Sequence, residues 1–90
     1  MTDRRLRAAN AHVAAIALQG QVTAPRYVKG VAQQVIVPVA DLCAAANGPR
    51  DRQLLLGEQV CVFDTQDGWS FVQVDKDGYV GYLNADQLGA

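Results

Sequence analysis

Few residues of this 90-residue chain have side chains suited to nucleophilic, acid–base or metal chemistry. The candidates are Cys43, Cys61 and His12, and they do not stand at a spacing typical of a metal site. Because His12 has no Cys, Asp or Glu near it in sequence, we expect a solvated surface histidine. A Cys–His pair formed by folding stays open, since catalytic partners need be adjacent only in space. No orienting group accompanies such a pair, so the sequence predicts no catalytic residue, no metal site and no cofactor.

Composition and charge exclude several classes of partner. Half of the residues are hydrophobic, which suits one small domain with its own core. The net charge is −1, and the basic residues are dispersed apart from short clusters at 4–7 and 50–52, so we expect no nucleic-acid surface. The longest apolar stretch is well short of the roughly 18 residues of a membrane helix, which predicts a soluble chain with no membrane partner. The Ala-rich stretch after the first arginines is too short and too polar for a signal peptide, and with two free thiols this predicts a cytoplasmic location.

The strongest structural signal lies in residues 67–83, DGWSFVQVDKDGYVGYL. Two apolar runs, 69–74 and 79–83, flank an Asp-Lys-Asp-Gly turn, and an Asp-Gly pair precedes the first run, so a β-hairpin is predicted. By the two-residue period, Trp69 and Phe71 point to one face of the first strand and its valines to the other. Both faces of this strand are therefore expected to be packed, as in a small barrel.

The rest of the chain is predicted as short elements around this hairpin. Asn10 is a plausible N-cap for a helix that ends at Gly20, and the Lys29-Gly30 pair is a turn signal between two β-branched runs. In chain order, the expected elements are a short helix at 10–20, a second hairpin at 22–28 and 33–37, a strand at 39–43, an exposed loop at 44–52, a strand at 59–64 and a helical turn at 84–88. These elements predict a mainly β fold.

The order and spacing of these residues resemble a known family. The series Val39-Ala40-Asp41-Leu42, a loop, Leu56-Gly57-Glu58-x-Val60-x-Val62, Asp67-Gly68-Trp69-x-x-Val72, and Gly78-Tyr79-Val80-Gly81-Tyr82-Leu83 followed by Leu88 is similar to a bacterial SH3 domain. Upstream, Leu18-x-Gly20-x-Val22-x-Ala24 resembles the N-terminal extension of the SH3 module in NlpC/p60 cysteine peptidases, which cleave murein peptides. The resemblance implies a small SH3-like β-barrel with a short N-terminal helix, in which a loose segment 1–9 precedes a domain 10–90 made of an extension, 10–38, and an SH3 core, 39–88.

The same resemblance implies a binding module and not an enzyme. Its usual neighbour is a C-terminal NlpC/p60 catalytic domain, so the expected partners are that domain and a murein stem peptide. The family's nucleophile has an Asp-Cys-Ser-Gly-like context that neither Cys43 nor Cys61 shares, so the chain alone is expected to be inactive. Apolar surface exposed at a domain boundary makes the isolated domain a candidate homodimer.

The murein interpretation also suggests ligand-binding residues. A carboxylate beside an aromatic wall binds an ammonium group by a charge-assisted hydrogen bond and a cation–π contact, and the candidate set is Asp51 on the long loop with Trp69 and Tyr82. Arg50 and Arg52 are candidates for binding peptide carboxylates, although charges on a loop are more often simply solvated. Trp69 could instead cap the core.

Two other binding modes compete with this one. Eukaryotic SH3 relatives bind polyproline through an aromatic groove, but Asn84 and Gln87 stand where that groove would need Pro and Tyr, which disfavours proline ligands. A stand-alone interaction module remains the alternative function. It would dock a protein through an exposed edge strand and the face that carries Trp69.

Overall fold

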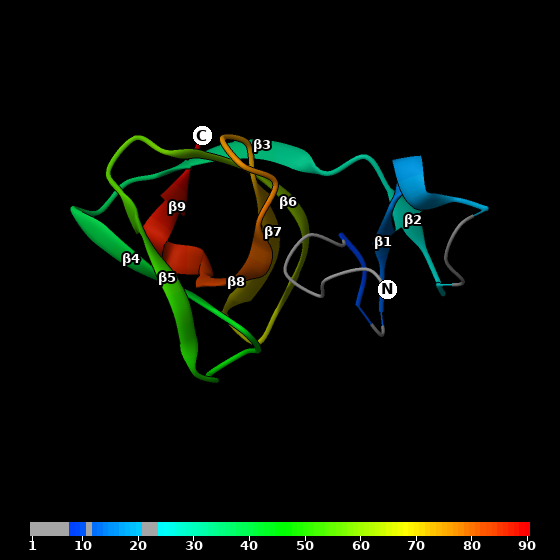
Figure 1. The fold of residues 1–90 in the computed structure, drawn as a ribbon, viewed down its shortest axis with the longest axis horizontal. Helices are drawn as coiled ribbons and strands as arrows, with labels where there is room; N and C mark the ends of the chain where they lie inside the picture. Colours follow the sequence, from blue (N-terminus) through cyan, green and yellow to red (C-terminus); the bar gives the residue numbers. More distant parts are fainter. Residues whose placement is uncertain (1–7, 11, 21–23) are drawn as a thin grey trace.

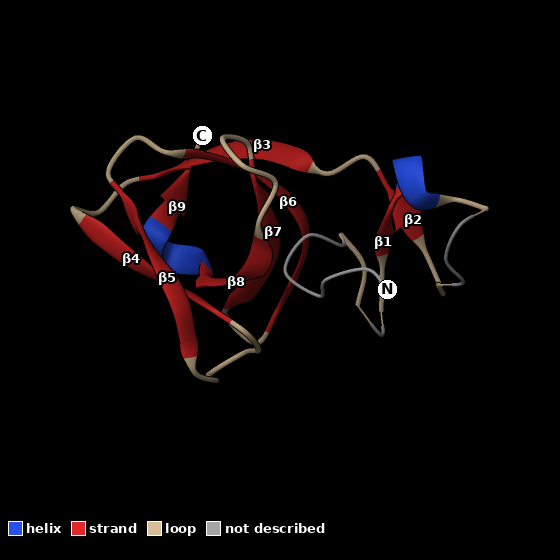
Figure 2. Ribbon diagram, in the orientation of Figure 1, coloured by secondary structure: helices blue, strands red, loops and turns tan. Residues whose placement is uncertain are grey.

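The computed structural model describes residues 8–10, 12–20 and 24–90. Apart from two single-turn 3-10 helices, η2 (Ile16–Leu18) and η3 (Ala85–Gln87), the regular structure of this part of the chain is strand (Figure 2). The strands are β1 (Ala14–Ala15), β2 (Tyr27–Val28), β3 (Val31–Val35), β4 (Val39–Cys43), β5 (Arg50–Leu55), β6 (Gln59–Gln66), β7 (Trp69–Val74), β8 (Val80–Asn84) and β9 (Leu88–Gly89).

Seven of these strands form one antiparallel sheet in the order β5-β4-β8-β7-β6-β3-β9 (Figure 1). The mainly β fold predicted from the sequence is thereby confirmed. Barrel closure is not detected, because no pairing between the two end strands, β5 and β9, is found in the described part of the chain. Strands β1 and β2 form a separate parallel pair, which stands beside the sheet in Figure 1.

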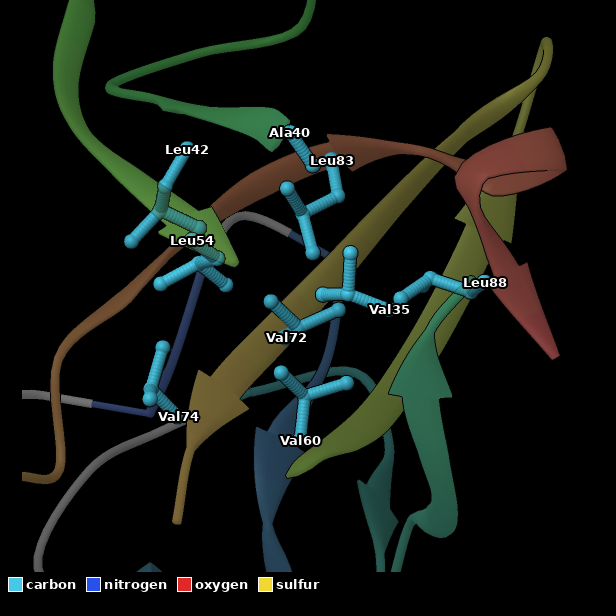
Figure 3. Packing of buried hydrophobic residues seen from close by; sticks show 9 residues of the cluster. All are labelled: Val35, Ala40, Leu42, Leu54, Val60, Val72, Val74, Leu83 and Leu88. Atoms are coloured by element: carbon cyan, nitrogen blue, oxygen red, sulfur yellow. The ribbon is translucent and has the colours of Figure 1, made fainter. Parts of the chain in front are cut away.

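One face of the large sheet holds the main hydrophobic core (Figure 3). Each of the seven strands contributes at least one aliphatic side chain to it. The members are Val35, Ala40, Leu42, Leu54, Val60, Val72, Val74, Leu83 and Leu88. Because strand residues alternate between faces, Val72 and Val74 of β7 enter this core while Phe71 points to the opposite face. The prediction that this strand is packed on both sides is confirmed.

The opposite face of the sheet is covered by the N-terminal segment. Ala8 and Val13 pack with Phe63 of β6, Phe71 of β7 and Val80 of β8 in a second buried cluster. The ring centroids of Phe63 and Phe71 lie 6.0 Å apart, a spacing typical of favourable aromatic pairs. Contacts between elements far apart in sequence therefore hold the N-terminal segment on the sheet.

The predicted N-terminal helix at 10–20 is wrong. In its place the backbone bonds to distant segments, with Ala14 N–H donating to Arg26 O at 2.9 Å and Ala15 N–H to Ala8 O at 2.8 Å. Only the 3-10 turn η2 is helical in the described part of this segment. Propensity favoured a helix for this Ala-rich stretch, but the strand pairing with β2 and the burial of Val13 outweigh that preference.

The predicted hairpin of 22–28 and 33–37 is also wrong. Residues 22 and 23 lie outside the described residues, and β2 pairs with β1 while β3 pairs with β6 and β9. Gly30, with φ of 85°, turns the chain from β2 into β3. The loose segment expected at 1–9 falls mostly outside the described residues, although Ala8 is buried and Ala9 forms a bridge with Ala14.

Predictions for the C-terminal half agree more closely with the structure. Strands β4 and β7 begin and end at the predicted residues, and η3 forms the helical turn that returns Leu88 to the core. The loop predicted at 44–52 is shorter, because β5 already begins at Arg50. The hydrogen bonds from Ala44 N–H to Pro49 O and from Gly48 N–H to Ala45 O make it a compact turn.

An ion pair joins β5 to the turn between β7 and β8. The Arg52 guanidinium donates to the Asp77 carboxylate and lies 4.7 Å from the centroid of the Tyr79 ring. Partial burial raises the pKa of Asp77. Hydrogen bonds from Arg52 and from the Tyr79 N–H, together with the positive charges of Arg52 and Lys76, lower it by more. The pKa of Asp77 is therefore below its ordinary value of 3.8. The negatively charged form is therefore favoured in the folded state.

Replacing Asp77 with asparagine is expected to lower the free energy of unfolding by about 0.5–1 kcal/mol at pH 7, because the pair is partly exposed. A carboxyl group with a depressed folded-state pKa stabilises the fold above its unfolded pKa and loses that effect as pH falls through the folded-state value. The difference between wild type and variant, measured by urea unfolding, should thus shrink as the pH falls below 3.8 and through the lowered folded-state pKa of Asp77. Asp75→Asn in the same turn is the matched control, and an equal loss in both variants would contradict the assignment.

Candidate functional site

Trp69 and Tyr82, two of the residues singled out from the sequence, line one cavity of about 200 Å³. It lies between the N-terminal turn that carries Asn10 and His12, the loop at Ala45, and the β6–β7 hairpin. We call it the seam cavity, because it opens where the N-terminal segment meets the sheet. The structure therefore brings together residues that are more than 70 positions apart in the chain.

The β6–β7 hairpin places Trp69 at the cavity through a two-residue turn. Gln66 and Trp69 are paired across the strands, and the two residues between them, Asp67 and Gly68, have φ values of 53° and 81°. Positive φ at both positions is typical of a type I′ turn, for which Asp-Gly is a favoured sequence. Trp69 is half-buried, so it forms part of the cavity wall without being enclosed in the core.

Two carboxylates line the same cavity and differ in their contacts. Asp64 is paired with Arg26 at 3.0 Å and accepts a hydrogen bond from Gln66 Nε2 at 2.9 Å. Asp67 is exposed, and within the described part of the chain its carboxylate has no ion pair or hydrogen bond. A free carboxylate beside an indole and a phenol suits a cationic ligand such as an ammonium group.

Tyr82 is held by contacts on both its ring and its hydroxyl. Its ring lies 5.2 Å from that of Phe71, and its hydroxyl accepts a hydrogen bond from Asn10 Nδ2 at 2.8 Å. A second cavity of about 160 Å³ shares Asn10, Phe71 and Tyr82 with the first. The Asn10–Tyr82 contact is thus part of the wall of both cavities.

The other predicted site residues lie elsewhere. Arg50, Asp51 and Arg52 are in β5, and none of them lines the seam cavity. Strand β4 separates them from Tyr82, since Cys43 pairs with Arg50 on one side and with Tyr82 on the other. Two strand spacings put β5 about 10 Å from β8. Arg50 lies 3.8 Å from Asp41 and Arg52 is paired with Asp77, so each arginine already has a carboxylate partner within this chain.

Sequence reasoning missed Asp67 as a candidate site residue. Asp67 was interpreted only as a turn former, although it stands two residues before Trp69 and lines the same cavity. The signal was therefore present in the turn itself. What the sequence lacked was the position of the N-terminal turn at Asn10, which completes the cavity.

Comparison with known families adds an observation that the geometry alone does not supply. The model of the bacterial dipeptidyl-peptidase SH3 domain matches residues 42–88, just over half of the chain. The chain belongs to this SH3 domain family. No curated protein and no solved structure matches it. The resemblance to a bacterial SH3 domain inferred from the sequence is confirmed, and residues 8–28 of the described chain lie upstream of the matched SH3 region.

The two cysteines of this SH3 domain have the electrostatic character of structural thiols. Burial, followed by the negative charges of Asp41 and Asp51, raises the pKa of Cys43, and the opposing effect of Arg50 does not cancel this. Burial and the charge of Asp75 raise the pKa of Cys61. Catalytic cysteines require a lowered pKa, so both shifts have the wrong direction for a nucleophile.

Metal ligands and His12 were the other candidates for chemistry in this SH3 domain. Within residues 8–10, 12–20 and 24–90, no group of three or more His, Cys, Asp or Glu side chains could hold a metal ion. His12 is exposed at the rim of the seam cavity. None of the helices in the described chain is long and apolar enough to cross a membrane.

Proposed function

We propose that this SH3 domain is a non-catalytic substrate-recognition domain of a cytoplasmic murein-peptide cysteine peptidase, and that the seam cavity binds the free amino end of the peptide. In this proposal an NlpC/p60 catalytic domain is the partner that cleaves the peptide. The family match supports an accessory role beside a cell-wall peptidase. The juxtaposition of Asp67, Trp69 and Tyr82 in one cavity is the single observation that carries the ligand assignment.

The chemistry of the cavity supports an ammonium ligand. An ammonium group carries three N–H donors and no acceptor, so it needs oxygen acceptors and a negative potential. Asp67 supplies an uncommitted carboxylate, and the Asp64 carboxylate lies in the same wall. The faces of Trp69 and Tyr82 supply the aromatic surface on which a cation is further stabilised. Asp67 therefore replaces Asp51 as the proposed anionic group.

The loop between β4 and β5 supports a role in limiting the cleft. Ala45 and Ala46 contribute to the cavity wall, and backbone hydrogen bonds within residues 44–49 close the loop on itself. In this proposal the loop closes one end of the cleft, so that binding would select a peptide end over an internal segment.

A specific observation also favours the second candidate function, a protein-interaction module. Four large aliphatic side chains are exposed at one end of the sheet, namely Ile36, Val39, Leu55 and Leu56. Val39 and Leu55 are cross-strand neighbours, and Leu56 N–H donates to Pro38 O, so the four gather at the β3–β4 and β5–β6 connections. Because β5 is also the last strand in the sheet order, this end offers both apolar surface and strand edge to a protein partner.

Fluorescence titration of the single tryptophan, Trp69, tests the proposed function directly. The dipeptide L-Ala-γ-D-Glu is expected to change the emission of Trp69 in a saturable manner. The same dipeptide with an acetylated amine should cause no change, because it carries no ammonium group. Equal responses to both peptides, or no response to either, would refute the assignment of the seam cavity to a peptide amine.

A further inference from the structure

We infer that Asn10 is a positioning residue that makes Tyr82 a hydrogen-bond donor toward the seam cavity. The inference rests on the proposed function and narrows the ligand class, from any amine to an amine that carries a carbonyl or carboxylate oxygen close to its nitrogen. The contacts of the Asn10 side chain carry the argument, since they fix which of its ends faces the phenol.

The carboxamide of Asn10 is oriented by the backbone of its own turn. Its Oδ1 atom accepts hydrogen bonds from the N–H groups of His12 at 2.8 Å and Val13 at 3.0 Å. The Asn10 N–H in turn donates to Val13 O at 2.9 Å, which closes the turn. With the carbonyl end committed to two backbone donors, the amino end must point the other way, toward Tyr82.

This orientation decides the direction of the hydrogen bond to Tyr82. An amide Nδ2 can only donate, so the Tyr82 oxygen is the acceptor at 2.8 Å. The phenol keeps its own proton, and no described residue accepts a hydrogen bond from it. Since Tyr82 lines the seam cavity, a ligand oxygen in that cavity is the natural acceptor for this proton.

A ligand that satisfies both ends of the site must combine two groups. Its ammonium contacts Asp67 and the aromatic faces, while an oxygen a few bonds away accepts from Tyr82. The amino end of a peptide has this arrangement, because the first carbonyl oxygen is separated from the amine by two carbon atoms. A simple alkylamine provides only the ammonium group and leaves the Tyr82 donor without a partner, which weakens its binding.

Asn10→Asp reverses the hydrogen bond without removing the turn. An aspartate oxygen accepts from the same two backbone N–H groups, because Asn and Asp both stabilise such turns. Its second oxygen can only accept, so the Tyr82 proton is drawn to it and is no longer offered to the ligand. Tyr82→Phe removes the donor altogether and keeps the ring beside Phe71.

The test compares L-alaninamide with isopropylamine, which lacks the carbonyl group, by NMR titration at pH 6.5, where both amines are protonated. Wild type is expected to bind L-alaninamide about fivefold more tightly, as one hydrogen bond provides. Asn10→Asp and Tyr82→Phe should each abolish this preference, and the double variant should lose nothing more. Isopropylamine should bind Asn10→Asp at least as well as wild type, because the substitution adds a negative charge.

Each other outcome overturns a defined claim. If Asn10→Asp retains the wild-type preference for L-alaninamide, the positioning role is wrong while the proposed function stands. If Asn10→Asp weakens both amines equally, Asn10 has only a structural role. If neither amine binds to wild type at the seam cavity, the proposed function fails and the inference fails with it. As a control, urea unfolding of each variant should give a stability close to that of wild type.

Discussion

Replacing Asp67 with asparagine is expected to weaken binding of a peptide amine about tenfold, because a charge-assisted hydrogen bond to the ammonium group is lost. The substitution leaves the fold intact. Asp67 has a φ of 53° at the first position of the β6–β7 turn, and Asn-Gly is the most favoured sequence for a type I′ turn. A loss of affinity in this variant therefore cannot be attributed to a distorted hairpin.

Asp51→Asn is the matched control for Asp67→Asn. It removes the same charge from the residue that the sequence alone suggested, which lies in β5 outside the seam cavity. We expect its affinity for the peptide to stay within twofold of wild type, since β4 separates β5 from Tyr82. Isothermal titration calorimetry of wild type and both variants measures these affinities for the peptide. A larger loss of affinity in Asp51→Asn than in Asp67→Asn would contradict this assignment and favour Asp51 as the group that binds the ammonium.

Replacing Leu54 with alanine is expected to lower the free energy of unfolding by about 3 kcal/mol. Leu54 is fully buried in the main core, where its side chain packs among residues from the other strands (Figure 3). Removing three carbon atoms from such a position loses their transfer free energy and leaves a cavity in a close-packed interior. For a small domain, this is a large fraction of the total stability.

Leu55→Ala is the control, because the neighbouring leucine in β5 is 59% exposed. Its effect on stability should be within about 0.5 kcal/mol. Urea unfolding followed by Trp69 fluorescence measures both variants under the same conditions. Equal destabilisation by the two substitutions would mean that β5 does not have the assigned alternation of faces.

The elements predicted correctly were those determined by local sequence. Strand β7 combines a two-residue alternation with turn residues at both ends, and all three features act within a few residues of one another. Strand β4 was bounded in the same manner, by Pro38 before it and the Ala-rich loop after it. In β7 the alternation assigned Phe71 and Val72 to opposite faces of the strand without knowledge of the rest of the fold.

The errors arose where distant segments compete with local preference. The segment at 10–20 contains good helix formers, yet its backbone bonds to Ala8 and Arg26 and its Val13 side chain is buried against the sheet. No pattern within residues 10–20 predicts these contacts with the rest of the fold. The same holds for Gly30, which was interpreted as the centre of a hairpin and instead separates a strand of the small sheet from a strand of the large one.

In the candidate site, too, the sequence indicated the residues that local patterns determine and missed those that depend on distant contacts. Trp69 and Tyr82 could be chosen from the sequence, the second of them by its resemblance to SH3 domains, because both lie in regular strands of the hairpin. The carboxylates that line the same cavity, Asp64 and Asp67, were not chosen, because the sequence did not show that the N-terminal turn at Asn10 meets the β6–β7 hairpin. Asn10 was predicted as a helix cap, and its side chain does accept backbone hydrogen bonds, but in a turn that contacts Tyr82.

The most direct test of the central claim is a two-dimensional ¹⁵N NMR titration of wild type with L-Ala-γ-D-Glu. The claim predicts saturable shifts that are largest for the Trp69 indole N–H, the Asp67-Gly68 turn and the backbone of Tyr82, and that vanish when the peptide amine is acetylated. Shifts confined to Ile36, Val39, Leu55 and Leu56, or shifts that the acetylated peptide reproduces, would contradict it.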